Sequence, residues 1–245
     1  MKTLTKLMLS LSLAFTFTAI LPAGCAFCAE KMSAVVVFVS GDVKVLHPDT
    51  KDYVELKVND ALMPGDSIKT GAGAKASIVS KGGAELRINE NSTFNIPGKS
   101  KVREMYELTV GQVWGRMLHK MAKLNVRTPS AVCAVRGTEA DIEQKDTLTT
   151  VKVYEGHVDL ENAQGKQSLH AGQISTVSGA SAAPAAPRQM STSEMGKWQE
   201  GIDVKDMGKY MDQVGIPAEG RKKLKINVVG KNGKSKNVEI QLKKK

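Results

Sequence analysis

Residues 125–142 read NVRTPSAVCAVRGTEADI, and the rest of the chain can be organised around this stretch. It begins as an extended segment, bends at Pro129, continues as a short apolar run typical of a buried strand, and breaks at Gly137. A glycine between two strand patterns indicates a bulge, a positive φ angle or a close backbone approach at which a Cβ atom would clash. We therefore predict two strands that meet at Gly137.

Arg136 is the charged residue inside this apolar run. Fully buried charges are rare unless they are paired, so we expect Arg136 to contact a carboxylate or several backbone carbonyls. Glu139 and Asp141 are the nearest carboxylates in the sequence. A structural ion pair at a strand kink is favoured over a contact with a ligand.

The motifs of this stretch resemble the signature of the FecR domain family. They are Val126-Arg127-Thr128-Pro129 and Val135-Arg136-Gly137-Thr138-Glu139, and the elements over residues 35–177 follow in the family's order. Ala140 stands where members often have an aromatic residue. The resemblance implies an all-β domain of the bacterial envelope, built as a roll or solenoid-like stack of short strands. It also implies a structural role for the family-motif residues Thr128, Pro129, Arg136, Gly137, Thr138 and Gly156.

In the best-known members of that family, the domain is the periplasmic sensor of an iron-uptake regulator. One membrane helix joins it to a cytoplasmic anti-sigma segment. The present sequence has a signal-like N-terminus and no second apolar run of the ~18 residues needed to span a bilayer. We therefore expect that this chain does not control a sigma factor directly.

Residues 1–29 have the pattern of a secretory signal peptide. A basic start and an apolar run over residues 7–21 are followed by small residues. Cleavage near residues 26–29 is favoured, and the alternative is a lipoprotein box in which Cys25 is lipidated. The expected location is periplasmic or secreted.

A short unit recurs along the strand-like part of the chain. It consists of a glycine, a polar residue and a valine, as in Gly41-Asp42-Val43, Gly111-Gln112-Val113 and Gly156-His157-Val158. The spacing of the units is too irregular for a strict repeat array. We interpret them as corners of one β-roll.

The composition divides the chain into four parts. Low-complexity Pro/Ala sequence is typical of a semi-stiff linker, whereas capping-box spacing and an Asn-Gly turn indicate a helix followed by a hairpin. The expected parts are a signal peptide (1–29), a FecR-like β domain (30–177), an Ala/Pro-rich linker (178–190) and a basic helix-plus-hairpin module (191–245).

The positive charge is concentrated in the last part. From residue 191 onward there are 13 basic and 7 acidic residues, within a chain of net charge +10. In an exported protein this excess favours a protein, polysaccharide or acidic lipid as the partner, and not nucleic acid. Contact with a membrane is expected only through a lipid anchor or a partner.

The residues that carry chemistry show no catalytic or ligand pattern. Four histidines are scattered without metal-ligand spacing, so we expect no metal and no cofactor. Cys133 should be a buried, inert thiol. Trp114 is interpreted as a packing residue, with stacking on a sugar as the alternative.

Three functions are compatible with this sequence. The first is a non-catalytic binding or scaffold module for an envelope protein or glycan. The second is a detached sensor that docks on a membrane signalling partner. The third, an envelope hydrolase, lacks a supporting motif, so we expect the protein not to be an enzyme.

Overall fold

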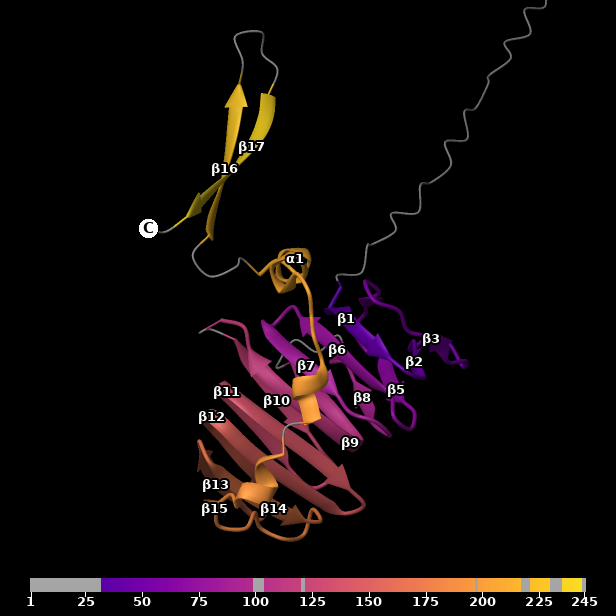
Figure 1. The fold of residues 1–245 in the computed structure, drawn as a ribbon, viewed down its shortest axis with the longest axis vertical. Helices are drawn as coiled ribbons and strands as arrows, with labels where there is room; N and C mark the ends of the chain where they lie inside the picture. Colours follow the sequence, from indigo (N-terminus) through magenta and orange to yellow (C-terminus); the bar gives the residue numbers. More distant parts are fainter. Residues whose placement is uncertain are drawn as a thin grey trace, which may run out of the picture. The chain divides into compact units, whose positions relative to one another are not determined.

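The structure, a computed structural model, describes residues 32–98, 104–119, 122–196, 198–216, 221–229 and 235–243. Strands make up most of it, with short helices near the C-terminus (Figure 1). The predicted all-β fold with a small C-terminal helix and a hairpin is confirmed. The predicted signal peptide, including Cys25, and the Asn232-Gly233 turn lie outside the described residues.

The strands and helices follow one another along the chain in a fixed order. They are β1 (Ala34–Ser40), β2 (Val43–Leu46), β3 (Val54–Glu55), β4 (Ala61–Leu62), β5 (Ser67–Thr70), β6 (Lys75–Ser80), β7 (Ala84–Ile88), β8 (Thr93–Asn95), β9 (Tyr106–Met117), β10 (Lys123–Arg127), β11 (Val132–Lys145), β12 (Leu148–Asn162), β13 (Gly165–His170), β14 (Gln173–Ser178), β15 (Arg188–Gln189), η1 (Thr192–Met195), η2 (Trp198–Gly201), α1 (Met207–Gln213), β16 (Arg221–Val229) and β17 (Ser235–Lys243).

The strands up to β15 pair into two layers that are joined by shared strands. The first layer runs in the order β4-β1-β6-β7-β9-β11-β12-β14-β15. The second layer runs in the order β3-β2-β5-β8-β9-β10-β11-β12-β13. Strands β9, β11 and β12 therefore belong to both layers.

Each shared strand changes partners at a glycine with positive φ. These glycines are Gly111 in β9, Gly137 in β11 and Gly156 in β12, with φ of 97°, 60° and 73°. In β11, for example, the residues before Gly137 pair with β10 and those after it pair with β9. The two strands predicted to meet at Gly137 are thus the two halves of one long strand, β11, which bends irregularly at this glycine.

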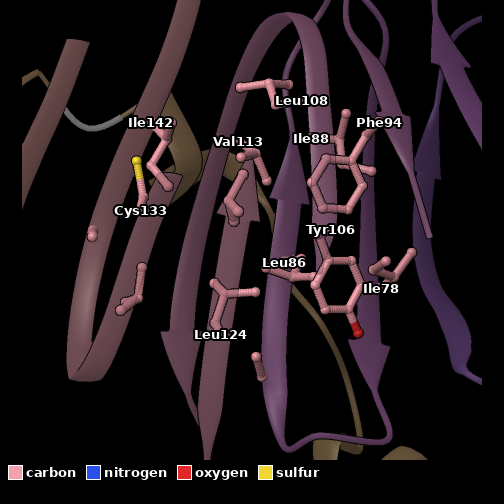
Figure 2. Close-up of a cluster of buried hydrophobic side chains, with 14 of the residues drawn as sticks. Ile78, Leu86, Ile88, Phe94, Tyr106, Leu108, Val113, Leu124, Cys133 and Ile142 are labelled. Carbon is pink, nitrogen blue, oxygen red and sulfur yellow. The ribbon is translucent and has the colours of Figure 1, made fainter. Parts of the chain in front are cut away.

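The inner faces of the two layers share one hydrophobic core. Figure 2 shows part of it, where Phe94 of β8 stacks on Tyr106 of β9 with ring centroids 5.6 Å apart. Most of the other core side chains are aliphatic, in keeping with an aromatic content of only 4%. Alternation along each strand places one set of side chains in this core and the other on the outer face.

Strand β1 is buried on both faces, which explains its continuous run of valines. Val36 points into the main core, whereas Val35 and Val37 belong to a second apolar cluster. That cluster includes Met211 and Val214 of α1, so the helix covers β1.

The Ala/Pro-rich segment 178–190 is packed against the sheet. Pro184 is buried, the Ala185 N–H donates to the Thr176 carbonyl (2.9 Å), and the Ser175 hydroxyl donates to the Ala185 carbonyl (2.6 Å). The sequence predicts a semi-stiff linker for this segment, and the structure shows in addition that strand β14 supplies hydrogen-bond partners for the backbone of Ala185. The other domain boundaries stay predictions.

Beyond this segment the chain forms two 3-10 turns where one α-helix was expected. The predicted capping box is present, with the Ser191 N–H donating to the Glu194 carboxylate (2.8 Å). The first turn, η1, ends at Gly196, whose backbone is extended, and η2 follows after it. We call residues 190–202 the strap. None of the described helices is long and apolar enough to cross a bilayer.

Candidate binding site beneath the strap

The family-motif residue Thr128 organises the turn between β10 and β11. Its hydroxyl oxygen accepts the N–H groups of Ser130 (3.3 Å) and Ala131 (3.1 Å). The Thr149 hydroxyl donates to the Gln144 side-chain carbonyl (2.5 Å), which leaves the Thr128 hydroxyl to donate to Thr149 (2.7 Å). This buried chain of hydrogen bonds ties the Thr-Pro turn to the β11–β12 hairpin.

We expect Thr128→Val to lower the free energy of unfolding by about 2–3 kcal/mol, because two backbone N–H groups lose their acceptor without access to water. Thr128→Ser keeps the hydroxyl and should cost only about 1 kcal/mol for the lost methyl group. Urea denaturation of both variants measures the difference. Equal losses would contradict the assigned role of the hydroxyl.

The other family-motif residues lie at the bend of the shared strands, and Arg136 differs from expectation. It is exposed, and Glu139 and Asp141 instead accept hydrogen bonds from Trp114 and Gln112. The physical reason is strand alternation, since the neighbouring Val135 fills the core and turns Arg136 outward. The prediction of a buried Arg136 paired with Glu139 or Asp141 is therefore wrong. The Ser168 hydrogen bond, with a further contribution from the charge of Arg136, lowers the pKa of Asp159 on β12.

The remaining motif residues lie in the Thr-Pro turn and at the bends of the shared strands. Pro129 follows Thr128 in the turn, and Thr138 lies in β11 directly after Gly137. Of the alternatives predicted for Gly137, the positive φ and a register irregularity of the strand are found. A close backbone approach is not, since a Cβ atom there would meet no atom within 4 Å, so the positive φ favours glycine. Gly156 occupies the equivalent bend of β12.

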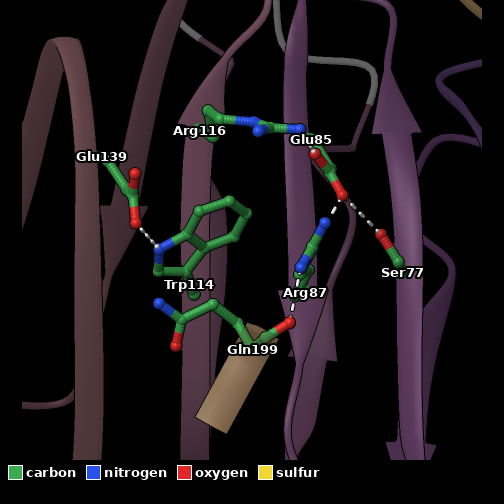
Figure 3. Close-up of polar contacts among 7 residues, drawn as sticks. All are labelled: Ser77, Glu85, Arg87, Trp114, Arg116, Glu139 and Gln199. Atoms are coloured by element: carbon green, nitrogen blue, oxygen red, sulfur yellow. Dashed lines mark hydrogen bonds and ion pairs between the residues drawn. The ribbon is translucent and has the colours of Figure 1, made fainter. Parts of the chain in front are cut away.

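A cluster of charged and aromatic side chains lies on the outer face of the first layer. Glu85 of β7 is fully buried, and its carboxylate accepts hydrogen bonds from Arg87 Nε (2.8 Å) and Arg116 Nη2 (2.6 Å) (Figure 3). Ser77 of β6 completes its surroundings at 3.5 Å.

Trp114 is the aromatic centre of the cluster. The guanidinium of Arg87 lies 4.8 Å from its ring centroid and that of Arg116 lies 5.6 Å away. The indole N–H donates to Glu139 Oε1 (3.1 Å), as Figure 3 shows. With 3% of its surface exposed, Trp114 is a packing residue, as interpreted from the sequence.

The strap closes over this face through Trp198. Its indole N–H donates to Asp141 Oδ2 (2.8 Å), and the amide of Gln112 donates to both oxygens of the same carboxylate (2.9 and 3.0 Å). The ammonium of Lys75 lies 5.7 Å from the centroid of the Trp198 ring. The carboxylate and the ammonium therefore both contact this one side chain.

Side chains of the sheet also donate hydrogen bonds to main-chain carbonyls of the strap. Lys75 donates to the carbonyl of Trp198 (3.2 Å) and Arg87 donates to that of Gln199 (2.5 Å). The Tyr154 hydroxyl donates to the carbonyl of Gly196 (3.1 Å). Neither the strap's position nor the burial of this cluster was predicted, since distant contacts of this kind leave no local sequence pattern.

Burial controls the acid–base properties of this site. It raises the pKa of Asp141 to about 6, against the lowering effects of the Gln112 and Trp198 hydrogen bonds and of Lys152. It also raises the pKa of Tyr154, with a further contribution from the charges of Asp141 and Glu139.

We expect Asp141 to make stability depend on pH between about 4 and 6. Its pKa of about 6 in the folded state exceeds the ordinary 3.8, so the folded protein binds this proton more tightly and stability falls as pH rises through that window. Relative to Asp141→Asn, the wild type should lose about 2–3 kcal/mol between pH 4 and 7.5. Urea denaturation at both pH values measures this, and a difference independent of pH would contradict it.

Cys133 is buried in the core, and burial raises the pKa of its thiol to about 12. The thiol therefore stays protonated and inert, as expected. Among the histidines, His47 Nδ1 lies 2.8 Å from Asp66 Oδ1, and the rings of His157 and His170 are 6.3 Å apart. Within the described residues, no three histidine, cysteine or acidic side chains converge as metal ligands.

The fold and the covered polar face define an all-β domain of two joined layers with a peptide segment held on one outer face. Residues 66–159 match the family model described as FecR protein. The chain thus contains a FecR region, which confirms the resemblance found in its motifs. The matched range includes the Thr-Pro turn, the bends of β9, β11 and β12, and most of the charged cluster.

Solved structures similar to this chain include two of one protein from Parabacteroides distasonis ATCC 8503, described as a "putative anti-sigma factor". They share 18% sequence identity with it, with TM-scores of 0.44 and 0.43. Each match covers 50% of this chain and 59% of the solved chain, less than two thirds of its length. No curated protein sequence matches the chain.

Proposed function

We propose that the protein is an exported, non-catalytic binding module of the bacterial cell envelope that acts through contact with a protein or polysaccharide partner. The match of residues 66–159 to the FecR family carries this proposal. The signal-peptide pattern of residues 1–29 supports export, with Cys25 as a candidate lipid attachment site.

The chemistry of the covered face agrees with binding. Glu85 is neutralised by two guanidinium groups, and Arg87 is also bonded to the strap. The Glu85 carboxylate and the two guanidinium groups hold one another in place, and such a rigid surface suits recognition of a partner with a fixed shape. The buried thiol of Cys133 is not a nucleophile at neutral pH.

A regulatory version of this function is favoured by the FecR match. In it, the domain is a detached periplasmic sensor that docks on a membrane signalling partner. The scaffold version is favoured by the 13 basic residues from 191 onward, which suit an acidic envelope polysaccharide or protein surface.

The test is capture of partners from an envelope fraction by the mature chain, read by mass spectrometry and by sugar analysis. The comparison chain ends at Ile216, so that it keeps the strap and the helix that covers Val35 and Val37. A membrane signalling protein captured by both chains would support the sensor. A polysaccharide or structural protein captured only by the longer chain would support the scaffold. Capture of neither would contradict the proposal.

A further inference from the structure

The strap and α1 are held on the same layer by different kinds of contact. Helix α1 covers β1 with apolar side chains such as Met211 and Val214. The strap buries two apolar side chains, Met190 and Ile202, near its ends. Between them it lies on charged groups, and three of its backbone carbonyls accept hydrogen bonds from side chains of the sheet. Any peptide segment with the same backbone conformation can accept these hydrogen bonds, because every residue carries a main-chain carbonyl.

At Trp198 the sheet contacts the side chain of the strap through specific polar and cationic groups. The sheet places the Asp141 carboxylate 2.8 Å from the indole N–H of Trp198 and the Lys75 ammonium over the indole ring. A carboxylate for the N–H and a cation for the ring face are together complementary to tryptophan. No other amino acid offers both a ring N–H donor and so large a π face.

The strap itself fits this site imperfectly. The Gln199 side-chain oxygen is buried and has no hydrogen-bond partner among the described residues. Burying an unpaired acceptor weakens the docked state. A segment with an apolar side chain at that position would therefore avoid this cost.

From these contacts we propose that the outer face of the first layer is a peptide-binding site for a tryptophan-bearing segment of a partner protein, and that the strap fills this site in the free protein. The proposal rests on the proposed binding function and specifies its protein partner. The strap must leave before the partner enters, so the apparent affinity for the partner is reduced by the fraction of closed molecules.

The test uses a synthetic peptide of residues 190–204 titrated calorimetrically into the full mature chain carrying Trp198→Ala, in which the tryptophan subsite is vacated. We expect binding to this chain, and about tenfold weaker binding when Asp141→Asn is added, because a charge-assisted hydrogen bond to the indole is lost. Wild-type chain, whose site is filled, should also bind about tenfold more weakly.

Two controls separate recognition of the tryptophan from nonspecific binding of the peptide. A peptide with alanine in place of its tryptophan should not bind, and Asp159→Asn, which changes a carboxylate on β12 outside the covered face, should leave binding unchanged. Circular dichroism verifies folding of each chain. If Trp198→Ala does not fold, Trp198→Phe keeps an aromatic ring while it removes the N–H donor and part of the π face.

Absence of peptide binding to the folded variants, or equal binding with and without Asp141→Asn, would overturn the proposal. A partner captured from the envelope with equal yield by wild type and by Asp141→Asn would also overturn it. In that case the proposed binding function would stand and its site would lie elsewhere. Capture that falls with Asp141→Asn would support both.

Discussion

Glu85→Ala is expected to lower the free energy of unfolding by about 3–5 kcal/mol, because it leaves a buried guanidinium without its counter-charge. Glu85 is fully buried, and its partner Arg87 keeps only 10% of its side chain exposed. Arg87 cannot recover water as a partner, since Trp114 and the strap cover it. Urea or thermal denaturation measures the loss.

Arg116→Ala is the matched control for this prediction. Arg116 contacts the same carboxylate at 2.6 Å, but 46% of its side chain is exposed. Its removal leaves Glu85 still paired with Arg87, so we expect a loss of about 1 kcal/mol. If Glu85→Ala cost no more than Arg116→Ala, the buried pair would not be the main support of this face.

Gly111→Ala should destabilise the protein by about 3 kcal/mol or more, because the new Cβ atom overlaps a fixed neighbour. It would lie 2.1 Å from the Ser92 hydroxyl oxygen and 2.5 Å from the Ser92 Cα, at a backbone φ of 97°. Ser92 cannot give way easily, because its hydroxyl accepts the N–H of Gln112 and its carbonyl accepts the N–H of Thr70.

Gly137→Ala is the matched substitution at the equivalent bend of β11. Its φ of 60° is one that alanine adopts with strain, and no atom lies within 4 Å of the added Cβ. We expect a loss of only about 1–2 kcal/mol. Thermal midpoints of the two variants compare them directly, and equal shifts would show that the contact with Ser92 is not decisive.

Local patterns were sufficient to predict much of the fold. The bend at the Thr-Pro turn and the glycine-entered strands each follow from neighbouring residues, and each is found in the structure. The helix and the hairpin near the C-terminus were likewise predicted from capping and turn residues. The FecR resemblance supplied the order in which these elements assemble.

The candidate site could not be predicted in the same way. Asp141 and Trp198 are 57 positions apart, and Arg87 and Gln199 are 112 apart, so no local pattern links them. The apolar neighbours of Arg136 predict an interior position, whereas strand alternation places this residue on the outside. A charge between apolar residues can face either solvent or a covering segment, and only the fold decides which.

The strands β9, β11 and β12 have a consequence for how the chain folds. Each must pair with neighbours in both layers, and β9 joins β7 on one side to β11 on the other, across long stretches of sequence. Neither layer can therefore be completed before the other has largely formed. Because most of the ordering entropy is lost before these distant pairs form, folding should be slow, on the millisecond-to-second scale of proteins dominated by non-local strand pairing.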